Sequence, residues 1–176
     1  MLLRRVIVER LRKIVRCENG GALAELAIMV PFLALLLAGV CEIGRFFQTY
    51  TTLAKATRSS TRYLSNHTIN ALEVGRAVNL VVCGKLTCAG GDEIVKGVAG
   101  GPAIAAANVC IEATATTVTV RIPRTNDCNP VAGVDAPAGN SYNYQPIFNL
   151  GALLGNPTFT LGPKLSPRTT MFKPSI

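Results

Sequence analysis

The sequence has little of what a catalytic or metal-binding site requires. Of its 176 residues only one is a histidine, His67, and no serine, cysteine or acid cluster accompanies it in a pattern typical of catalysis. The acidic residues beyond residue 65 are scattered along the chain and fall into no metal-ligand spacing. They are Glu73, Asp92, Glu93, Glu112, Asp127 and Asp135. We therefore expect no enzyme activity, no catalytic residue, no metal site and no cofactor.

A nucleic-acid-binding motif is also lacking, although the net charge is +8. The positive charge is unevenly placed, because residues 1–20 carry six Lys or Arg and only two acids. Basic residues before an apolar segment indicate which end stays in the cytoplasm. The charge is thus explained by membrane topology, and we expect no nucleic-acid partner.

Residues 22–41 contain one charged residue, Glu25, and the uninterrupted apolar run from Leu26 to Cys41 is 16 residues long. Together with residues 22–24 the run approaches the ~20 residues that cross a bilayer. A segment in lipid satisfies its own backbone hydrogen bonds, so we expect a transmembrane helix at residues 21–41 with the lipid bilayer as its surroundings. Pro31 removes one backbone donor and predicts a kink in that helix.

Glu25 is the unusual residue of this helix. A charged side chain deep in a membrane helix costs about 2.5–3.5 kcal/mol, and less near its end. One interpretation places the carboxylate at the headgroup level with no role. The other pairs it with a cation in the membrane, such as an N-terminal amine created by cutting the chain shortly before it.

The step Gly20-Gly21-Ala22-Leu23-Ala24-Glu25 resembles the processing site of type IV pilin-like precursors, in which a basic leader ends in glycine and the mature chain has Glu at its fifth position. Cutting after Gly20 would make Gly21 the first residue and Glu25 the fifth. Leu26 departs from the pattern, where Phe is more frequent.

The longer pattern is similar to the TadE-like family, the minor pseudopilins of the tight-adherence (Flp) pilus. After the small-residue step and Glu25, it continues through Pro31 in the apolar stretch to the motif Glu42-Ile43-Gly44-Arg45. The resemblance extends over residues 19–64. It is more specific than the glycine and glutamate step alone.

The resemblance implies a function and a set of partners. A prepilin peptidase would remove the leader between Gly20 and Gly21, and Glu25 would then neutralise a mature N-terminal amine. The partners would be that peptidase, other pilins and pseudopilins, and the inner-membrane assembly platform of the pilus. The protein would cross the bacterial inner membrane once, with a cytoplasmic N-terminus and a periplasmic C-terminal domain. Both residence in the membrane and incorporation into the fibre stay open.

The expected fold class is α+β, with a long pilin-like helix, a second helix and a small antiparallel β domain. Residues 1–20 form a basic amphipathic leader that ends at the break Asn19-Gly20-Gly21, and residues 42–64 an amphipathic extension of the transmembrane helix. Residues 65–176 form the exported domain. The apolar face of the extension is predicted at Ile43, Phe46, Tyr50, Leu53, Thr57 and Leu64.

Within the exported domain we expect a helix at residues 69–82 and β segments at residues 108–123, 144–148, 158–161 and 169–172. The alternation of apolar and polar residues within 108–123 changes phase near residues 116–117, which predicts a tight hairpin or a bulge. Four cysteines fall in this domain: Cys83, Cys88, Cys110 and Cys128. An oxidising compartment favours two disulfides, for which the local pairs Cys83–Cys88 and Cys110–Cys128 are our choice among three pairings. A zinc site is the rival interpretation.

Two other hypotheses fit the same sequence. The first is an uncleaved single-pass anchor that presents a periplasmic binding domain and retains its leader. The second is a secreted, β-rich protein with a long signal peptide, whose mature chain would start near Cys41.

Overall fold

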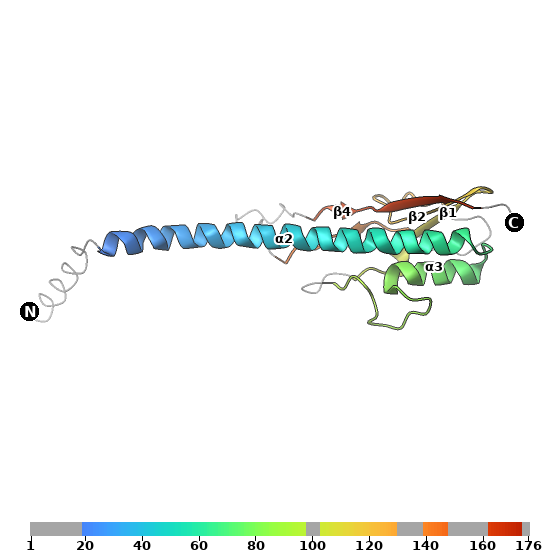
Figure 1. Cartoon of the computed structure of the whole chain (residues 1–176), viewed down its shortest axis with the longest axis horizontal. Helices are drawn as coiled ribbons and strands as arrows, with labels where there is room; N and C mark the ends of the chain where they lie inside the picture. The colour runs from blue at the N-terminus through green and yellow to red at the C-terminus, as the bar shows by residue number, and fades with distance from the viewer. Residues whose placement is uncertain (1–18, 98–102, 130–138, 148–161, 174–176) are drawn as a thin grey trace, which may run out of the picture. The chain divides into compact units, whose positions relative to one another are not determined.

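A computed structural model of the chain describes residues 19–97, 103–129, 139–147 and 162–173 (Figure 1). The chain divides into two compact units, Met1–Cys41 and Glu42–Ile176. The secondary structure combines helices with small antiparallel sheets, so the predicted α+β class is confirmed. The predicted amphipathic leader lies outside the described residues, apart from its last two positions.

Helix α2 (Asn19–Ser65) is 47 residues long and contains Pro31. Its start differs from the sequence prediction, because Asn19, Gly20 and Gly21 are helical where a break was expected. Glycine in a helix costs only about 1 kcal/mol relative to alanine, and the following Ala-Leu-Ala-Glu sequence strongly favours a helix. The helix therefore extends three residues further than the apolar run requires.

The end of α2 explains the single histidine. The carbonyl of Tyr63 accepts hydrogen bonds from the backbone N–H of Asn66 at 3.2 Å and from the Nδ1 of His67 at 2.8 Å. The His67 ring also stacks on the Tyr63 ring, with centroids 4.1 Å apart. His67 thus adds a second donor to a carbonyl in the last turn of the helix, where the regular intrahelical donors have run out.

Helix α3 (Ala71–Cys83) matches the predicted second helix to within two residues. The side chain of Asn70 caps its N-terminus by accepting a 2.9 Å bond from the Glu73 N–H, and Gly84 ends it in a left-handed conformation. The hydroxyl of Ser60 on α2 donates to the Ala77 carbonyl at 2.8 Å. This bond joins the two helices in the interior of the second unit.

The main sheet has the order β1-β2-β5 and is antiparallel throughout. It contains β1 (Cys110–Ala113), β2 (Thr117–Arg121) and β5 (Arg168–Phe172), while β3 (Tyr142–Asn143) pairs with β4 (Lys164–Leu165) in a second, two-stranded sheet. A short 3-10 helix, η1 (Ala106–Asn108), precedes β1. The phase change predicted near residues 116–117 is a hairpin, since Ala113 pairs with Val118 across it.

One strand prediction was wrong. Residues 144–147 of the predicted strand 144–148 are not in a strand, and the short strand β3 lies immediately before them. Pro146 has no N–H to donate to a ladder, and the Ile147 N–H bonds to Glu42 instead. The strand predicted at 158–161 lies outside the described residues, whereas that predicted at 169–172 is confirmed as β5.

The core of the second unit lies between α2, α3 and the main sheet. It takes in alternating residues of the hairpin, such as Ile111, Val118 and Val120, and buried positions of both helices. The fully buried apolar residues include Leu53, Leu64, Val74, Val81, Val109, Ile111, Val118 and Val120.

The predicted buried face of the helix extension was partly wrong. Leu53, Thr57 and Leu64 are buried, but Ile43 is 59% and Tyr50 41% exposed. Many of the buried or half-buried positions instead form a helical stripe that is largely polar. Its members are Glu42, Arg45, Phe46, Thr49, Leu53, Ala56, Thr57, Ser60, Thr61 and Leu64. Hydrophobic periodicity could not reveal a stripe made mainly of charged and hydroxyl side chains.

Candidate functional site

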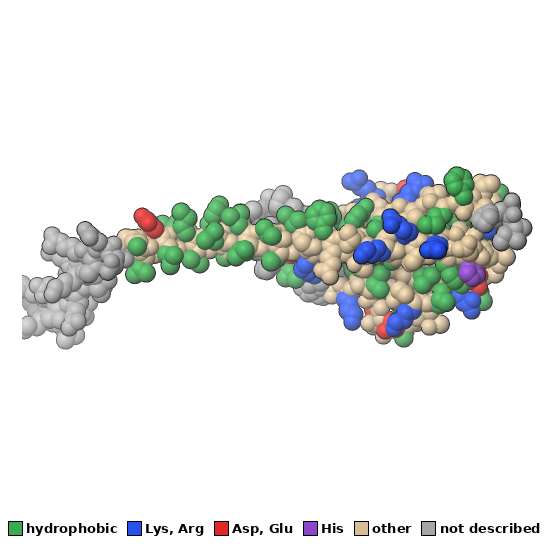
Figure 2. Space-filling view, in the orientation of Figure 1, with side chains coloured by type: hydrophobic (Ala, Val, Ile, Leu, Met, Phe, Trp, Pro, Cys, Tyr) green, Lys and Arg blue, Asp and Glu red, His purple; other side chains and the backbone are tan. Residues whose placement is uncertain are grey.

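The part of α2 that precedes Glu42 is apolar and exposed. It belongs to a helix, Gly21–Ser65, that is long and apolar enough to cross a membrane by length and composition, and none of its most apolar window is buried within the chain. Figure 2 shows hydrophobic side chains along this exposed stretch. The described residues contain one such helix.

Glu25 lies in this segment with its side chain exposed. No described residue forms a hydrogen bond or an ion pair with it. Gly21 is also open, because a Cβ added there would meet no atom within 4 Å. Among the described residues, the structure therefore leaves Gly21 and the Glu25 carboxylate accessible. The roles of the predicted processing site and of this carboxylate stay predictions, as does the kink at Pro31.

The motif residues Glu42 and Arg45 lie together at the beginning of the second unit. The Glu42 carboxylate accepts a 2.5 Å hydrogen bond from the Tyr144 hydroxyl and a 3.2 Å bond from the Ile147 N–H. Its side chain is only 12% exposed, and its Oε1 lies 4.0 Å from Nη1 of Arg45. Glu42 thus fastens the loop after β3 to α2.

Tyr144 completes this cluster and was not identified from the sequence as a site residue. Its ring is buried and meets Phe46 edge-on, with centroids 5.4 Å apart. Burial, together with the hydrogen bond to Glu42, raises the pKa of Tyr144 to about 12. The phenol therefore stays protonated and keeps donating to Glu42 even at a pH of about 10, where an ordinary tyrosine is half ionised.

Gly44, the other motif residue, has no side chain that could join this cluster. A Cβ added at Gly44 would meet no atom within 4 Å. Packing among the described residues therefore does not require glycine at this position. A small residue on an exposed helix surface permits close approach of another helix.

A second cluster surrounds one of the two disulfides. The structure pairs Cys83 with Cys88 and Cys110 with Cys128, with Cα–Cα distances of 5.8 and 5.7 Å. Close to the second pair, Arg121 donates to Glu112 at 2.7 Å, and this bond raises the pKa of the guanidinium. Arg121 also pairs with Asp127 at 3.1 Å. These contacts hold the segment after β2 against the hairpin.

Gly139 lies against the same disulfide with a φ of +66°. A Cβ there would come within 2.9 Å of the Cys128 Sγ and 3.2 Å of the Cys110 Cβ. Among the described residues, no group of three or more His, Cys, Asp or Glu side chains could hold a metal ion. The four cysteines, for which zinc was the rival interpretation, are engaged in disulfides in the structure.

The fold and helix α2 place this protein in the class of small α+β domains with an apolar helix that could anchor them in a membrane. Residues 20–62 match the family model described as TadE-like protein. This match confirms the resemblance seen in the sequence, and the matched segment runs from Gly20 to Arg62 through Glu25, Pro31 and Glu42. The chain shows no match to a curated protein or to a solved structure.

Proposed function

We propose that this protein is a minor pseudopilin that takes part in the assembly of a tight-adherence pilus after a prepilin peptidase removes its leader. The observation that carries the proposal is the TadE-like match from residue 20, which coincides with an exposed apolar helix. The role is structural rather than catalytic. The protein would act with other pilins and pseudopilins and with the inner-membrane assembly platform.

In this proposal, the Glu25 carboxylate pairs with a mature N-terminal amine. An unpaired carboxylate in hydrocarbon is penalised, whereas a pair with an amine gains from the low dielectric constant. Cleavage after Gly20 would place an amine four residues before Glu25, in its own chain or in a neighbouring one. The exposed carboxylate has no described partner, so it is free to make this pair.

Exposed apolar residues of the helix extension support packing against neighbouring subunits. Ile43, Phe47 and Tyr50 are 59%, 59% and 41% exposed and recur at helical spacing. Gly44 lies next to this stripe and leaves open space. A neighbouring helix could therefore approach α2 closely here without disturbing the core of the second unit.

The charge distribution supports one orientation of the chain in the membrane. The six basic residues of the leader favour a cytoplasmic N-terminus, which would place the second unit in the periplasm. That compartment is oxidising, as the two disulfides require. The leader, transmembrane helix and exported domain would thus each have a separate environment.

The first test is the N-terminal sequence and intact mass of the protein recovered from membranes, with and without the peptidase. We expect a chain that begins at Gly21 only when the peptidase is present. Gly20→Asp should block cleavage, whereas Gly39→Ala, where a Cβ meets open space, should be cut normally. Normal cleavage of Gly20→Asp would refute the site.

The role of Glu25 is tested separately from cleavage. Glu25→Ala and the shape-conserving Glu25→Gln should insert and be processed, yet fail to support pilus assembly. Normal piliation in both variants would refute the pairing. Loss of processing would instead show that Glu25 acts before assembly.

The uncleaved anchor is the second candidate, and one observation favours it. Gly20 and Gly21 are helical, whereas an endopeptidase binds its substrate as an extended chain. A chain that begins at Met1 both with and without the peptidase would establish this alternative. Glu25 would then be a headgroup-level residue.

A further inference from the structure

A small polar cavity lies beside Arg45 in the second unit. It has a volume of about 20 Å³ and is lined by Arg45 and Thr49 of α2, by Val95 and Lys96, and by residues of the segment at 142–145. A cavity measured in this way needs ~10–15 Å³ to hold one water. There is thus room for one small polar group.

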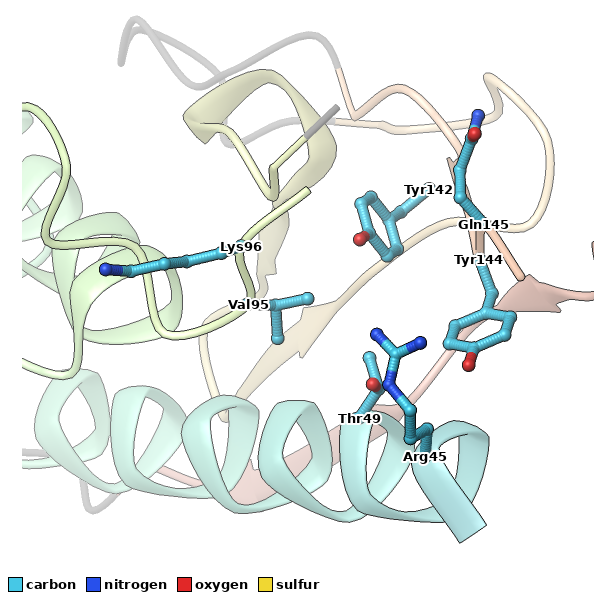
Figure 3. A pocket seen from close by; sticks show the side chains of 7 residues that line it. All are labelled: Arg45, Thr49, Val95, Lys96, Tyr142, Tyr144 and Gln145. Carbon is cyan, nitrogen blue, oxygen red and sulfur yellow. The ribbon is translucent and has the colours of Figure 1, made fainter. Parts of the chain in front are cut away.

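Arg45 aims its charge into this cavity. Figure 3 shows its guanidinium directed toward Tyr142, whereas the ammonium of Lys96 points away, so that Lys96 contributes mainly its stem. The Nη1 atom of Arg45 is buried and makes no hydrogen bond. A buried donor that lacks a hydrogen-bond acceptor carries an uncompensated desolvation penalty, which is larger for a charged group than for a neutral one.

The described residues form no hydrogen bond to this nitrogen, and the Arg45 side chain as a whole is 33% exposed. The nearest acid is Glu42, whose Oε1 lies 4.0 Å away and accepts from the Tyr144 hydroxyl. The remaining described acids of this unit bond elsewhere in the chain. They are Glu73, Asp92, Glu93, Glu112 and Asp127.

We propose that Arg45 and this cavity form a binding site for a single carboxylate group. A carboxylate matches the planar donor fork of arginine, and its head fits a cavity of this size. The Thr49 hydroxyl is a further donor at the wall, close to the guanidinium in Figure 3. The carboxylate belongs either to a free small acid or to an acidic side chain of a partner protein.

The experiment uses the full-length protein in detergent micelles and two probes, sodium acetate and N-acetylglutamate methylamide. Thermal unfolding is followed by circular dichroism, with sodium chloride holding the ionic strength constant. A ligand that binds only the folded protein raises Tm with its concentration and its affinity. We expect a saturable rise in Tm of several degrees with acetate.

The two probes separate the sources of the carboxylate. A rise with acetate alone supports a free small acid, and a rise with both supports an acidic side chain of a partner. A rise with neither overturns the proposal, because the cavity then holds water only.

Variants link the effect to Arg45. Arg45→Gln should abolish the rise, Arg45→Lys should retain part of it, and Arg58→Gln, an exposed arginine of the same helix, should retain all of it. A full rise in Arg45→Gln would overturn the proposal. If that variant does not fold, the arginine side-chain NMR signals of the wild type decide, since acetate should shift that of Arg45 and leave that of Arg58 unchanged.

Discussion

Replacing Tyr144 by phenylalanine tests how strongly the loop after β3 is held to α2. The substitution removes the hydroxyl that donates to Glu42 at 2.5 Å and keeps the ring that meets Phe46 edge-on. A hydrogen bond to a charged group contributes roughly 1.5–3 kcal/mol. Glu42 retains the Ile147 N–H at 3.2 Å. We therefore expect the free energy of unfolding to fall by about 1.5–3 kcal/mol.

The assay is urea unfolding of the full-length protein in detergent, followed by circular dichroism, in a double-mutant cycle of Tyr144→Phe with Glu42→Gln. We expect a coupling energy of about 1–3 kcal/mol between the two sites. Tyr50→Phe is the matched control, because this tyrosine lies on α2, as Glu42 does, and is 41% exposed. It should change the free energy of unfolding by less than about 0.5 kcal/mol. Additive single effects, within ~0.5 kcal/mol, would refute the contact.

The burial of Tyr144, together with the same bond, predicts a dependence of stability on alkaline pH. The pKa of Tyr144 is raised to about 12 in the folded protein, against about 10 in the unfolded chain. The folded state therefore holds its proton longer, and the stabilisation is complete below pH ~10 and lost as the pH rises to about 12. A two-unit difference corresponds to about 2–3 kcal/mol. Tyr144→Phe should remove that part of the pH dependence, and an unchanged profile would contradict the assignment.

Two further predictions concern the second unit. Gly139→Ala should destabilise the protein by more than about 2 kcal/mol in urea unfolding, because the new Cβ meets Cys128 at a position with positive φ. Gly91→Ala is the control: its φ is +92° but its Cβ would meet open space, so it should show the backbone cost alone. Equal losses of stability in the two variants would contradict the clash. Cys110→Ser opens the disulfide that spans 18 residues and should lower the free energy of unfolding by about 3 kcal/mol. Cys83→Ser opens a span of 5 and should lower it by about 2 kcal/mol. A larger loss in Cys83→Ser would count against chain entropy as the cause.

Local patterns carried most of what the sequence predicted. The apolar run and its flanking motif identified α2 and its TadE-like segment, and alternation with a phase change located the hairpin of β1 and β2. The pairs Cys83–Cys88 and Cys110–Cys128 close short spans, which is why they were chosen. Each of these features is encoded within about 45 residues of sequence.

The features that sequence reasoning missed depend on distant contacts. The buried stripe of α2 at Glu42, Arg45 and Thr49 is polar, so periodicity of apolar residues pointed to Ile43 and Tyr50 instead. The cavity beside Arg45 is lined by segments around residues 45, 95 and 142, and no local pattern links them. The two-residue strands β3 and β4 are too short to produce alternation.

The bond between Glu42 and Tyr144 has a consequence for the time course of folding. Its partners are 102 positions apart in the chain. At a synthesis rate of ~5–20 residues per second, Glu42 is added to the chain about 5–20 s before Tyr144. Throughout that interval the carboxylate lacks its strongest donor, and the wall of the cavity beside Arg45 is incomplete. This end of the domain can therefore close only after nearly the whole chain has been made, so a nascent chain that stops before residue 144 would lack both features.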